Sequence, residues 1–382
     1  MKFCFINEIF PYKKDGELII TGGGESHGFF LAKELVNRGH EVVAITGKWN
    51  DSPSFEIIDG IEFYRYPSLV PFYNQKALNM IRNYAITAFP LFKLFFKICK
   101  ENRPDFVISN LTPSLFEAMF LSKLKRMRYV ITVHDLYGIR DISKYNRIDF
   151  SFLPNIVGNF YLWHYRFLIS QADFIETVSN YSMTQLSCII PKHKIFVSGN
   201  GVDLEKYQYT EDKQNLIVVM GRLISYKNVD RAIKIFIRLK IKFPDVKLII
   251  IGEGPQRSKL MSSTKNKEDI IFTGFLPETK KIETLRRAKI LLSCSDLEGF
   301  SMGPIEAMAC GAVPVVSDIP AHGEIFDNNE TIFNNSLDAV EIIGNLLTDE
   351  SLRIKIAKKN RNVVESRYNW ELVCDRFLRS IK

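Results

Sequence analysis

The 382-residue sequence lacks several features that would assign it to a specialised class of protein. Its six cysteines are scattered and form no Cys-x-x-Cys pair, so neither a disulfide framework nor a cysteine zinc site is expected. Its six histidines show no His-Glu-x-x-His or comparable metal-ligand spacing. No apolar run reaches the roughly 18 residues of a membrane span, and the first residues read as a strand rather than as a signal peptide.

The composition is that of a folded, basic protein. A hydrophobic fraction of 46% with 25% charged residues excludes global disorder. The net charge of +8 favours anionic partners such as nucleotide phosphates, acidic lipid or nucleic acid, although a biased composition rich in Lys, Ile, Phe and Asn explains it equally well. At roughly 150 residues per domain, the length indicates two or three domains.

Short β-branched runs alternate with longer amphipathic segments, a pattern typical of βαβ units and parallel sheets. The first series predicts strands at 2–6, 41–46, 61–66, 105–109, 129–133, 174–178 and 195–198, with helices at 26–38, 114–125 and 161–171. The second predicts strands at 216–220, 247–251, 270–272, 290–293 and 312–316, with helices at 229–242, 256–261, 279–288 and 304–310. The polar segment 203–213 is the predicted linker. The fold class is therefore α/β, with two consecutive Rossmann-like domains.

Two loops could bind phosphate. The glycines Gly22, Gly23 and Gly24 precede a helix, where free backbone N–H groups can approach an anion. They could equally form a plain turn, and their spacing does not match a dinucleotide fingerprint. Arg222 and Lys227 follow a clear strand and could bind a diphosphate, or could be solvated loop cations.

Two further elements could bind hydroxyl groups. Glu298 lies in a loop and Glu306 in the first turn of the following helix, so both could bind sugar or ribose hydroxyls; alternatively, Glu306 only offsets the helix dipole. His134-Asp135 end a strand, where the histidine could contact a ligand hydroxyl or pack beside a helix cap formed by Asp135.

Residues 90–100 form an amphipathic segment with Lys93, Lys97 and Lys100 at helical spacing, and a second basic stretch covers 123–126. Basic helices with aromatic residues can lie in a membrane interface, although such a helix more often covers a core with its lysines in solvent. Nucleic-acid binding is the weakest option, because the basic residues form no patch interleaved with aromatics.

These motifs occur in the order found in a known family. The five elements are Gly22-Gly23 with Glu25 and His27; His134-Asp135; Asn200-Gly201-Val202-Asp203; Gly221-Arg222 with Lys227; and Glu298 to Glu306, which form a Glu-x7-Glu element. Gly252-Glu253-Gly254-Pro255 and Gly274-Phe275-Leu276 also stand where such a protein has them. Over nearly its whole length, the chain resembles the retaining glycosyltransferases of family 4, the glycosyl transferases group 1.

The resemblance implies the GT-B fold: two facing Rossmann-like domains, with the final helix crossing back to the first. An acceptor-side domain is expected at 1–205 together with the helix 367–382, and a nucleotide-sugar-binding domain at 206–366. The implied reaction moves a sugar from a nucleoside-diphosphate donor to a hydroxyl of a glycan or lipid-linked acceptor, without a metal or other cofactor.

The resemblance also implies residue roles. Glu298, His134, Arg222 and Lys227 are the predicted catalytic residues. Donor-binding roles are implied for Gly22, Gly23, Arg222, Lys227, Phe275, Leu276, Glu298, Ser301, Met302, Gly303 and Glu306. Family members commonly have Gly-Phe-Gly where this chain has Gly299-Phe300-Ser301. Serine in place of glycine adds a side chain beside the sugar site, so this departure leaves the identity of the donor sugar open.

Two other functions remain open from the sequence: a non-hydrolysing sugar-nucleotide epimerase, which needs no acceptor, and a non-catalytic scaffold that binds a nucleotide sugar. Reading the two glutamates as a hydrolase pair leaves the phosphate-binding motifs unexplained. We expect a cytoplasmic protein, with peripheral contact to the inner membrane surface through 90–100 and 123–126.

Overall fold

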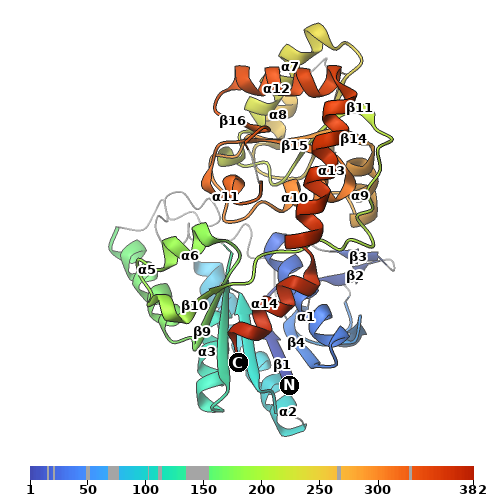
Figure 1. Ribbon diagram of the computed structural model, residues 1–382. Coiled ribbons are helices and arrows are strands. Elements are labelled where there is room, and N and C mark those ends of the chain that lie inside the picture. Colours follow the sequence, from blue (N-terminus) through green and yellow to red (C-terminus); the bar gives the residue numbers. More distant parts are fainter. Residues whose placement is uncertain are drawn as a thin grey trace. The chain divides into compact units, whose positions relative to one another are not determined.

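The computed structural model describes residues 1–14, 17–19, 22–48, 52–67, 77–101, 103–110, 114–134, 155–264, 268–326 and 329–382. It contains two compact units, one formed by Met1–Gly199 with Cys374–Lys382 and the other by Asn200–Val373 (Figure 1). The sequence had predicted the two junctions after residues 205 and 366. Asp135, part of one predicted motif, lies outside the described residues.

The first unit is built on an eight-stranded sheet in the order β10-β9-β8-β7-β1-β4-β6-β5. Neighbouring strands pair in parallel except β5 with β6. The strands are β1 (Lys2–Ile6), β4 (Glu41–Lys48), β5 (Phe55–Ile58), β6 (Ile61–Pro67), β7 (Phe106–Asn110), β8 (Arg128–Val133), β9 (Phe174–Thr177) and β10 (Ile195–Val197). A separate hairpin pairs β2 (Tyr12–Lys14) with β3 (Glu17–Ile19).

Helices cover both faces of this sheet. One face packs against α2 (Ala77–Glu101), α3 (Leu115–Leu124), α5 (Asn155–Ser170) and α6 (Asn180–Leu186) in a single hydrophobic cluster. The side chain of Phe3 alternates to the other face, where it meets Phe377 of α14 (Trp370–Ser380) at 6.3 Å between ring centroids. The long α1 (Gly23–Asn37) buries Phe29, Leu31 and Leu35.

The end of the chain returns to the first unit, as the sequence predicted. Phe377 is fully buried there, and the Arg128 guanidinium donates a hydrogen bond of 3.1 Å to the Ile381 carbonyl. Val373, Cys374 and Phe377 are all fully buried, and this buried face accounts for the apolar stripe of the last helix.

The second unit is built on a six-stranded parallel sheet in the order β13-β12-β11-β14-β15-β16. Its strands are β11 (Gln214–Met220), β12 (Lys247–Ile251), β13 (Ile270–Gly274), β14 (Ala288–Ser293), β15 (Val313–Ser317) and β16 (Ile332–Phe333). Its helices are α7 (Val229–Lys242), α8 (Arg257–Ser263), α9 (Glu278–Arg287), α10 (Met302–Cys310), α11 (Pro320–Gly323), α12 (Ser336–Thr348) and α13 (Glu350–Arg367).

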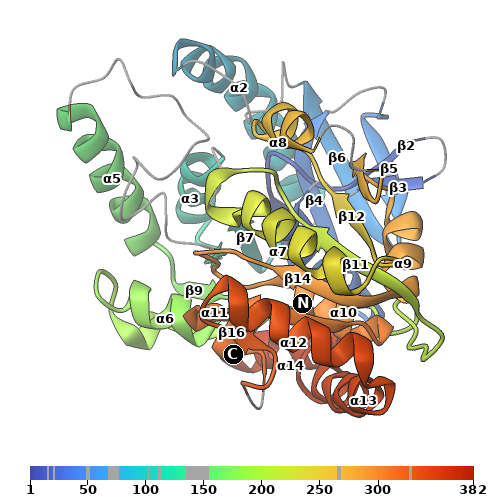
Figure 2. The same ribbon diagram turned by 90° about the horizontal axis from the view of Figure 1, so that it is seen from above.

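Alternate residues of β11 face opposite layers of this unit. Ile217 and Val219 pack with α7, α8 and α12, whereas Leu216 and Val218 pack with α9 and α10. Figure 2 shows α7 and α12 lying together on their shared layer. Each unit is thus a sheet between two layers of helices, which is the Rossmann-like arrangement that the alternating pattern predicted.

The predicted strands are all present, with ends shifted by at most two residues. The sequence analysis missed β2, β3, β5 and β16. These are short strands at an edge or in a hairpin, and their few residues leave no clear period. The helix predicted at 161–171 begins earlier, at Asn155.

Two glycines shape the carboxyl edge of the second sheet. Gly221 has a φ of +146° and Gly252 one of +137°, values that residues with a side chain rarely adopt. A Cβ atom on Gly252 would lie 2.0 Å from the Gly221 carbonyl oxygen. The loops after β11 and β12 therefore approach each other more closely than any side chain would allow, and this places Arg222 at the sheet edge.

Candidate active site

The phosphate-binding candidates of the second unit lie at the carboxyl ends of β11 and β14. Arg222 and Lys227 line a small pocket together with Gly221, Ser293 and Ser295. Arg222 is exposed, and its guanidinium donates to the Tyr226 hydroxyl at 3.1 Å. Lys227 ends a short 3-10 turn (Ser225–Lys227) that directly precedes α7. The pocket thus presents two cations at the sheet edge where ligands bind in open α/β folds.

Lys227 is paired with Glu298, one of the two predicted glutamates. The side chains are 20% and 12% exposed, so the pair lies near solvent rather than in the core, and Lys227 lines the pocket. His322 is fully buried, and its Nδ1 lies 2.7 Å from the Ser317 carbonyl. Burial lowers the pKa of His322, with Glu298 and Lys227 among the charges that act on it. A neutral imidazole therefore lies close to this ion pair.

Helix α10 begins immediately after the glutamate loop. Ser301 is its N-cap residue, and its side chain does not cap the helix. The Ser301 hydroxyl is buried and has no hydrogen-bond partner among the residues that the structure describes. Met302 and Gly303 form the first turn, where backbone N–H groups lack partners within the helix. This helix end, with its positive dipole, is a ready site for an anion or for sugar hydroxyls.

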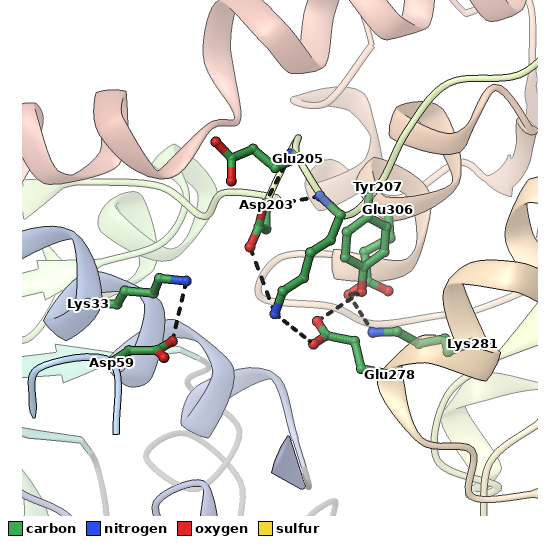
Figure 3. Close-up of polar contacts among 9 residues, drawn as sticks. Lys33, Asp59, Asp203, Glu205, Tyr207, Glu278, Lys281 and Glu306 are labelled. Atoms are coloured by element: carbon green, nitrogen blue, oxygen red, sulfur yellow. Dashed lines mark hydrogen bonds and ion pairs between the residues drawn. The ribbon is translucent and has the colours of Figure 1, made fainter. Parts of the chain in front are cut away.

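Glu306 lies at the centre of a second polar cluster, drawn in Figure 3. Its Oε1 accepts hydrogen bonds from Lys281 Nζ at 2.9 Å and from the Tyr207 hydroxyl at 3.3 Å. The Tyr207 oxygen also lies 3.5 Å from Glu278 Oε1. Burial and the two neighbouring carboxylates raise the pKa of Tyr207 well above its usual value, so the phenol stays protonated and donates. The sequence had placed Glu306 in the first turn of its helix, but α10 begins at Met302 and has no acidic residue in that turn. Glu306 is therefore a hydrogen-bonded carboxylate rather than a charge that offsets the helix dipole.

The same cluster reaches the predicted Asn200–Asp203 motif. Lys206 Nζ lies 3.3 Å from Glu278 Oε2 and 3.9 Å from Asp203 Oδ2. Asp203 also accepts hydrogen bonds from the backbone N–H of Glu205 at 3.2 Å and of Lys206 at 3.3 Å, which fixes the turn (Figure 3). The turn that opens this unit is thus linked to the glutamate of α10.

Phe275 and Leu276 follow β13. Phe275 is 50% exposed, and Leu276 packs partly against the hydrophobic cluster that contains α10. An exposed aromatic ring at the end of a strand can stack on a planar base, which is compatible with the predicted role.

In the first unit, the glycine loop and His134 lie together. Gly22 is the N-cap of α1 in an extended conformation, and Gly23 is the first residue of that helix. A Cβ atom on Gly24 would lie 3.1 Å from His134 Cδ2, so a small residue is required there. The His134 ring also meets the His27 ring edge-on, at 5.1 Å between centroids. Two motifs more than 100 residues apart therefore form one site at the carboxyl edge of the first sheet.

Several residues of these two sites were missed by the sequence analysis. Glu176 hydrogen-bonds His27; Lys281 and Tyr207 contact Glu306; Tyr226 accepts from Arg222. None of them belongs to a motif with a regular spacing. Only Glu176 carried a signal, since a glutamate within the apolar strand 174–178 is a buried charge that requires partners.

Two family models match this chain and together cover most of it. The model described as "Glycosyltransferase Family 4" matches residues 21–206, and the one described as "Glycosyl transferases group 1" matches residues 203–363.

Curated relatives agree with these matches. The chain is 26% identical to a subunit of the human phosphatidylinositol N-acetylglucosaminyltransferase over 369 residues, which cover 93% of this chain and 72% of the relative. It is 21% identical to N-acetyl-alpha-D-glucosaminyl L-malate synthase of Bacillus anthracis, over 94% of this chain and 93% of that protein.

Solved structures show the same fold. Sucrose-phosphate synthase from Thermosynechococcus elongatus superposes with a TM-score of 0.75 at 15% identity, covering 99% of this chain and 97% of that one. Anabaena HepE in complex with UDP-glucose superposes with a TM-score of 0.73 at 17% identity, covering 100% and 99%.

Proposed function

Because this chain belongs to glycosyltransferase family 4 and has the GT-B fold, we propose that it is a retaining enzyme using a nucleoside-diphosphate sugar. The acceptor in this proposal is a hydroxyl of a glycan or of a lipid-linked molecule. One observation supports it most directly: Arg222, Lys227 and the start of α10 gather positive charge at the carboxyl edge of the second sheet.

Positive charge at that edge suits the leaving group of the reaction. Breaking a glycosyl–phosphate bond develops negative charge on the diphosphate, which Arg222 and Lys227 stabilise in this mechanism. Lys227 is already held in place by Glu298, and a bound phosphate would share or take over this ammonium. The forked guanidinium of Arg222 can bind two phosphate oxygens at once.

The remaining donor contacts follow from the same geometry. Glu306, held by Lys281, would accept hydrogen bonds from the ribose hydroxyls, and Phe275 or Leu276 would lie against the base. Glu298, Ser301 and the N–H groups of Met302 and Gly303 would contact the donor sugar and its phosphate.

The first unit would complete the site through Gly22, Gly23 and His134. The glycine loop at the start of α1 would approach the phosphates, and His134 would contact the transferred sugar. In the retaining reaction, the acceptor hydroxyl attacks the face that the diphosphate leaves, and the departing phosphate oxygen takes the hydroxyl proton. Positioning and electrostatics supply the catalysis, without a covalent sugar–enzyme intermediate.

Metal independence is part of the proposal. The charges of Arg222, Lys227 and α10 take the place that a divalent cation would have on the diphosphate. In the part of the chain that the structure describes, no group of three or more His, Cys, Asp or Glu side chains is placed to hold a metal ion.

The names of two relatives indicate where to begin with substrates. The human protein is named for transfer of N-acetylglucosamine to phosphatidylinositol, and the Bacillus anthracis protein for an N-acetylglucosaminyl malate product. We therefore take UDP-N-acetylglucosamine and UDP-glucose as first donors, with phosphatidylinositol vesicles and L-malate as first acceptors.

Turnover with these substrates tests the proposal. The enzyme should release UDP when donor and acceptor are both present, and the product should keep the anomeric configuration of the donor. Formation of an epimer from donor alone would instead identify an epimerase. Specific stabilisation by a nucleotide sugar, seen as a raised melting temperature, without turnover on a broad acceptor panel would identify a binding scaffold.

Peripheral membrane contact is the last part of the proposal. Helices α2 and α3 expose several aromatic and aliphatic side chains: Phe89, Phe96, Phe116, Phe120 and Leu124. Exposed cations accompany them: Lys93, Lys97, Lys100, Lys123 and Arg126. Lys125 Nζ lies 4.9 Å from the centre of the Phe96 ring. This mixture favours the interface of an anionic bilayer. Each helix within the described residues is too short or too polar to cross one.

Co-sedimentation with vesicles tests this contact. Vesicles that contain phosphatidylserine should bind the protein at low salt and release it at high salt. Replacing Phe96 and Phe120 by serine should weaken binding several-fold, whereas serine at Ile241, which is 86% exposed on α7, should not. Equal loss in both variants would contradict a specific membrane surface.

A further inference from the structure

A buried glutamate lies beneath the histidines of the first unit. Glu176 of β9 is fully buried, and three side chains approach its carboxylate. Oε1 accepts from the Ser198 hydroxyl at 2.5 Å and lies 3.2 Å from His27 Nε2, while Oε2 accepts from the Thr132 hydroxyl at 2.6 Å. The carboxylate is therefore well supplied with donors in the middle of the domain.

The charge state of Glu176 differs from that of another buried glutamate in the same unit. Burial alone would raise the pKa of Glu176, but His27, Ser198 and Thr132 outweigh it and hold that pKa below its usual value. Burial, with the neighbouring Glu117, raises the pKa of Glu8 to about 9. Near neutral pH, Glu176 is thus a buried anion and Glu8 a neutral acid.

The anion faces a histidine that contacts the site. Because Glu176 is ionised, His27 Nε2 must carry the proton of their hydrogen bond, which fixes the tautomer and the ring orientation of His27. The His27 ring meets the His134 ring at an interplanar angle of 73°. Gly24 closes on His134 from the start of α1. The orientation of His134 therefore depends on a ring that Glu176 holds.

The end of the chain contributes to the same network. Arg376 of α14 donates from Nε to the Ser198 carbonyl at 2.6 Å, and the Ser198 hydroxyl donates to Glu176. A chain of contacts thus runs from the last helix through Ser198, Glu176 and His27 to His134.

We propose that Glu176, acting through His27, is a positioning residue that orients His134 toward the donor sugar. This inference rests on the proposed function of His134. It assigns a role to two buried groups that the mechanism above does not use. Replacing the hydrogen-bond partner of a metal-ligating histidine typically changes activity by about 10–100-fold, and we expect an effect of the same order from a histidine that is held in the same way here.

The variant Glu176→Gln tests the proposal because it keeps the shape and removes the charge. We expect kcat to fall about 10–100-fold, while the KM for the donor changes little, since the second unit holds the diphosphate. A role in stability alone would lower the melting temperature and leave kcat per folded molecule unchanged, and that result would overturn the proposal.

A double-mutant cycle with His134→Ala sharpens the test. If Glu176 acts through His134, then E176Q in the H134A background should lose little further activity. Multiplicative losses in the double variant would overturn the inference. Should E176Q fail to fold, His27→Gln serves in the same cycle, because it removes the ring that meets His134.

A matched control and a second measurement separate this inference from the proposed function. Glu8→Gln replaces a buried neutral acid by its near-isostere, so its turnover should match that of the wild type. In NMR spectra of histidine-labelled protein, the His134 ring signals should move in E176Q and stay in place in E8Q. If H134A is fully active, the proposed role of His134 fails, yet the NMR result still decides whether Glu176 positions the ring. Unmoved signals in E176Q would overturn the positioning.

Discussion

The candidate sites of the two units hold their charged side chains in opposite ways. In the first, His27 and Glu176 are both 0% exposed and lie 3.2 Å apart. In the second, Lys227–Glu298 and Lys281–Glu306 form ion pairs whose side chains are 10–22% exposed. A fully buried pair keeps a fixed arrangement because separating it leaves a buried charge, whereas a pair near water can open and accept a new partner. In the proposed mechanism, the pair in the first unit orients a ring, and the pairs in the second exchange a carboxylate for a ligand.

We expect the largest loss of activity when Arg222 or Lys227 is replaced. Arg222→Ala or Lys227→Ala should lower kcat/KM by about 10²–10³-fold, because each removes a charge that stabilises the leaving diphosphate. Lys227→Ala also leaves Glu298 without its cation beside the phosphate site.

Steady-state UDP release measures both variants. Lys234→Ala is the matched control, since this exposed lysine of α7 pairs only with Asp230 within its own helix at 3.2 Å among the described residues. Full activity in both R222A and K227A would show that the roles assigned to these residues are wrong. The proposed functional contrast between the sites of the two units would then fail as well.

A smaller effect is expected at Glu306. Glu306→Gln weakens hydrogen bonds to the ribose and removes the anion that Lys281 contacts, so the donor KM should rise about 10-fold with a lesser change in kcat. The matched control is Glu283→Gln on α9, a glutamate that is 70% exposed and pairs weakly with Arg287. An unchanged KM in E306Q would place the ribose elsewhere.

Replacing Ser301 should change the preference between donor sugars more than the overall rate of transfer. Its buried hydroxyl has no partner among the described residues, so a donor sugar that hydrogen-bonds it gains about 1 kcal/mol over one that does not. Ser301→Gly should therefore change the ratio of kcat/KM for UDP-N-acetylglucosamine and UDP-glucose by roughly 5-fold. The ratio is measured in one mixture, which cancels errors in enzyme concentration. A constant ratio would show that this hydroxyl does not face the sugar.

The smallest effect concerns the pH dependence of stability. Glu8 has a folded pKa of about 9 against an ordinary value of 4.5, so the folded chain keeps a proton that the unfolded chain loses. The free energy of unfolding of the wild type should consequently fall as the pH rises from about 5 to 9, because folding becomes linked to the uptake of a proton by Glu8. The variant E8Q has no such proton, so this part of its pH dependence should be absent.

Glu176 should show the opposite sign. Its pKa is lowered on folding, so the stability that it contributes is present above the ordinary value and is lost as the pH falls through the folded pKa. For Glu8, melting temperatures are measured from pH 4 to 9. Because the wild type loses the Glu8 contribution as the pH rises, the melting temperature of E8Q should rise relative to that of the wild type over this range. A difference between E8Q and wild type that does not vary with pH would contradict the assignment of Glu8 as a buried neutral acid.

The sequence was sufficient for the central strands of both sheets and for the residues that follow them, but not for the short edge strands β5 and β16. Strands such as Lys2–Ile6 and Lys247–Ile251 were predicted at their observed bounds because their apolar runs end at polar or glycine residues. Arg222 and Lys227 were found for the same reason, since a residue just beyond a parallel strand lies at the ligand-binding edge. The roles assigned to them remain predictions.

The partners of the site residues could not be predicted in this way. Glu176 and His27 are 149 positions apart, and Lys281 and Glu306 are 25 apart. Neither pair lies within one helix or strand, so no periodic pattern in the sequence indicates its contact. Nor did the sequence show that Gly24 must be small because His134 lies against it.

The chain order of apolar and polar residues by itself determined two sheet-and-helix units and the edge at which each could bind a ligand, because side-chain periodicity and loop position are local properties. Only the tertiary structure decided which charges are buried as fixed anions and which stand near water as exchangeable pairs. That distinction depends on the desolvation of each group and on the donors that distant segments bring to it, and both are established only when the chain is packed.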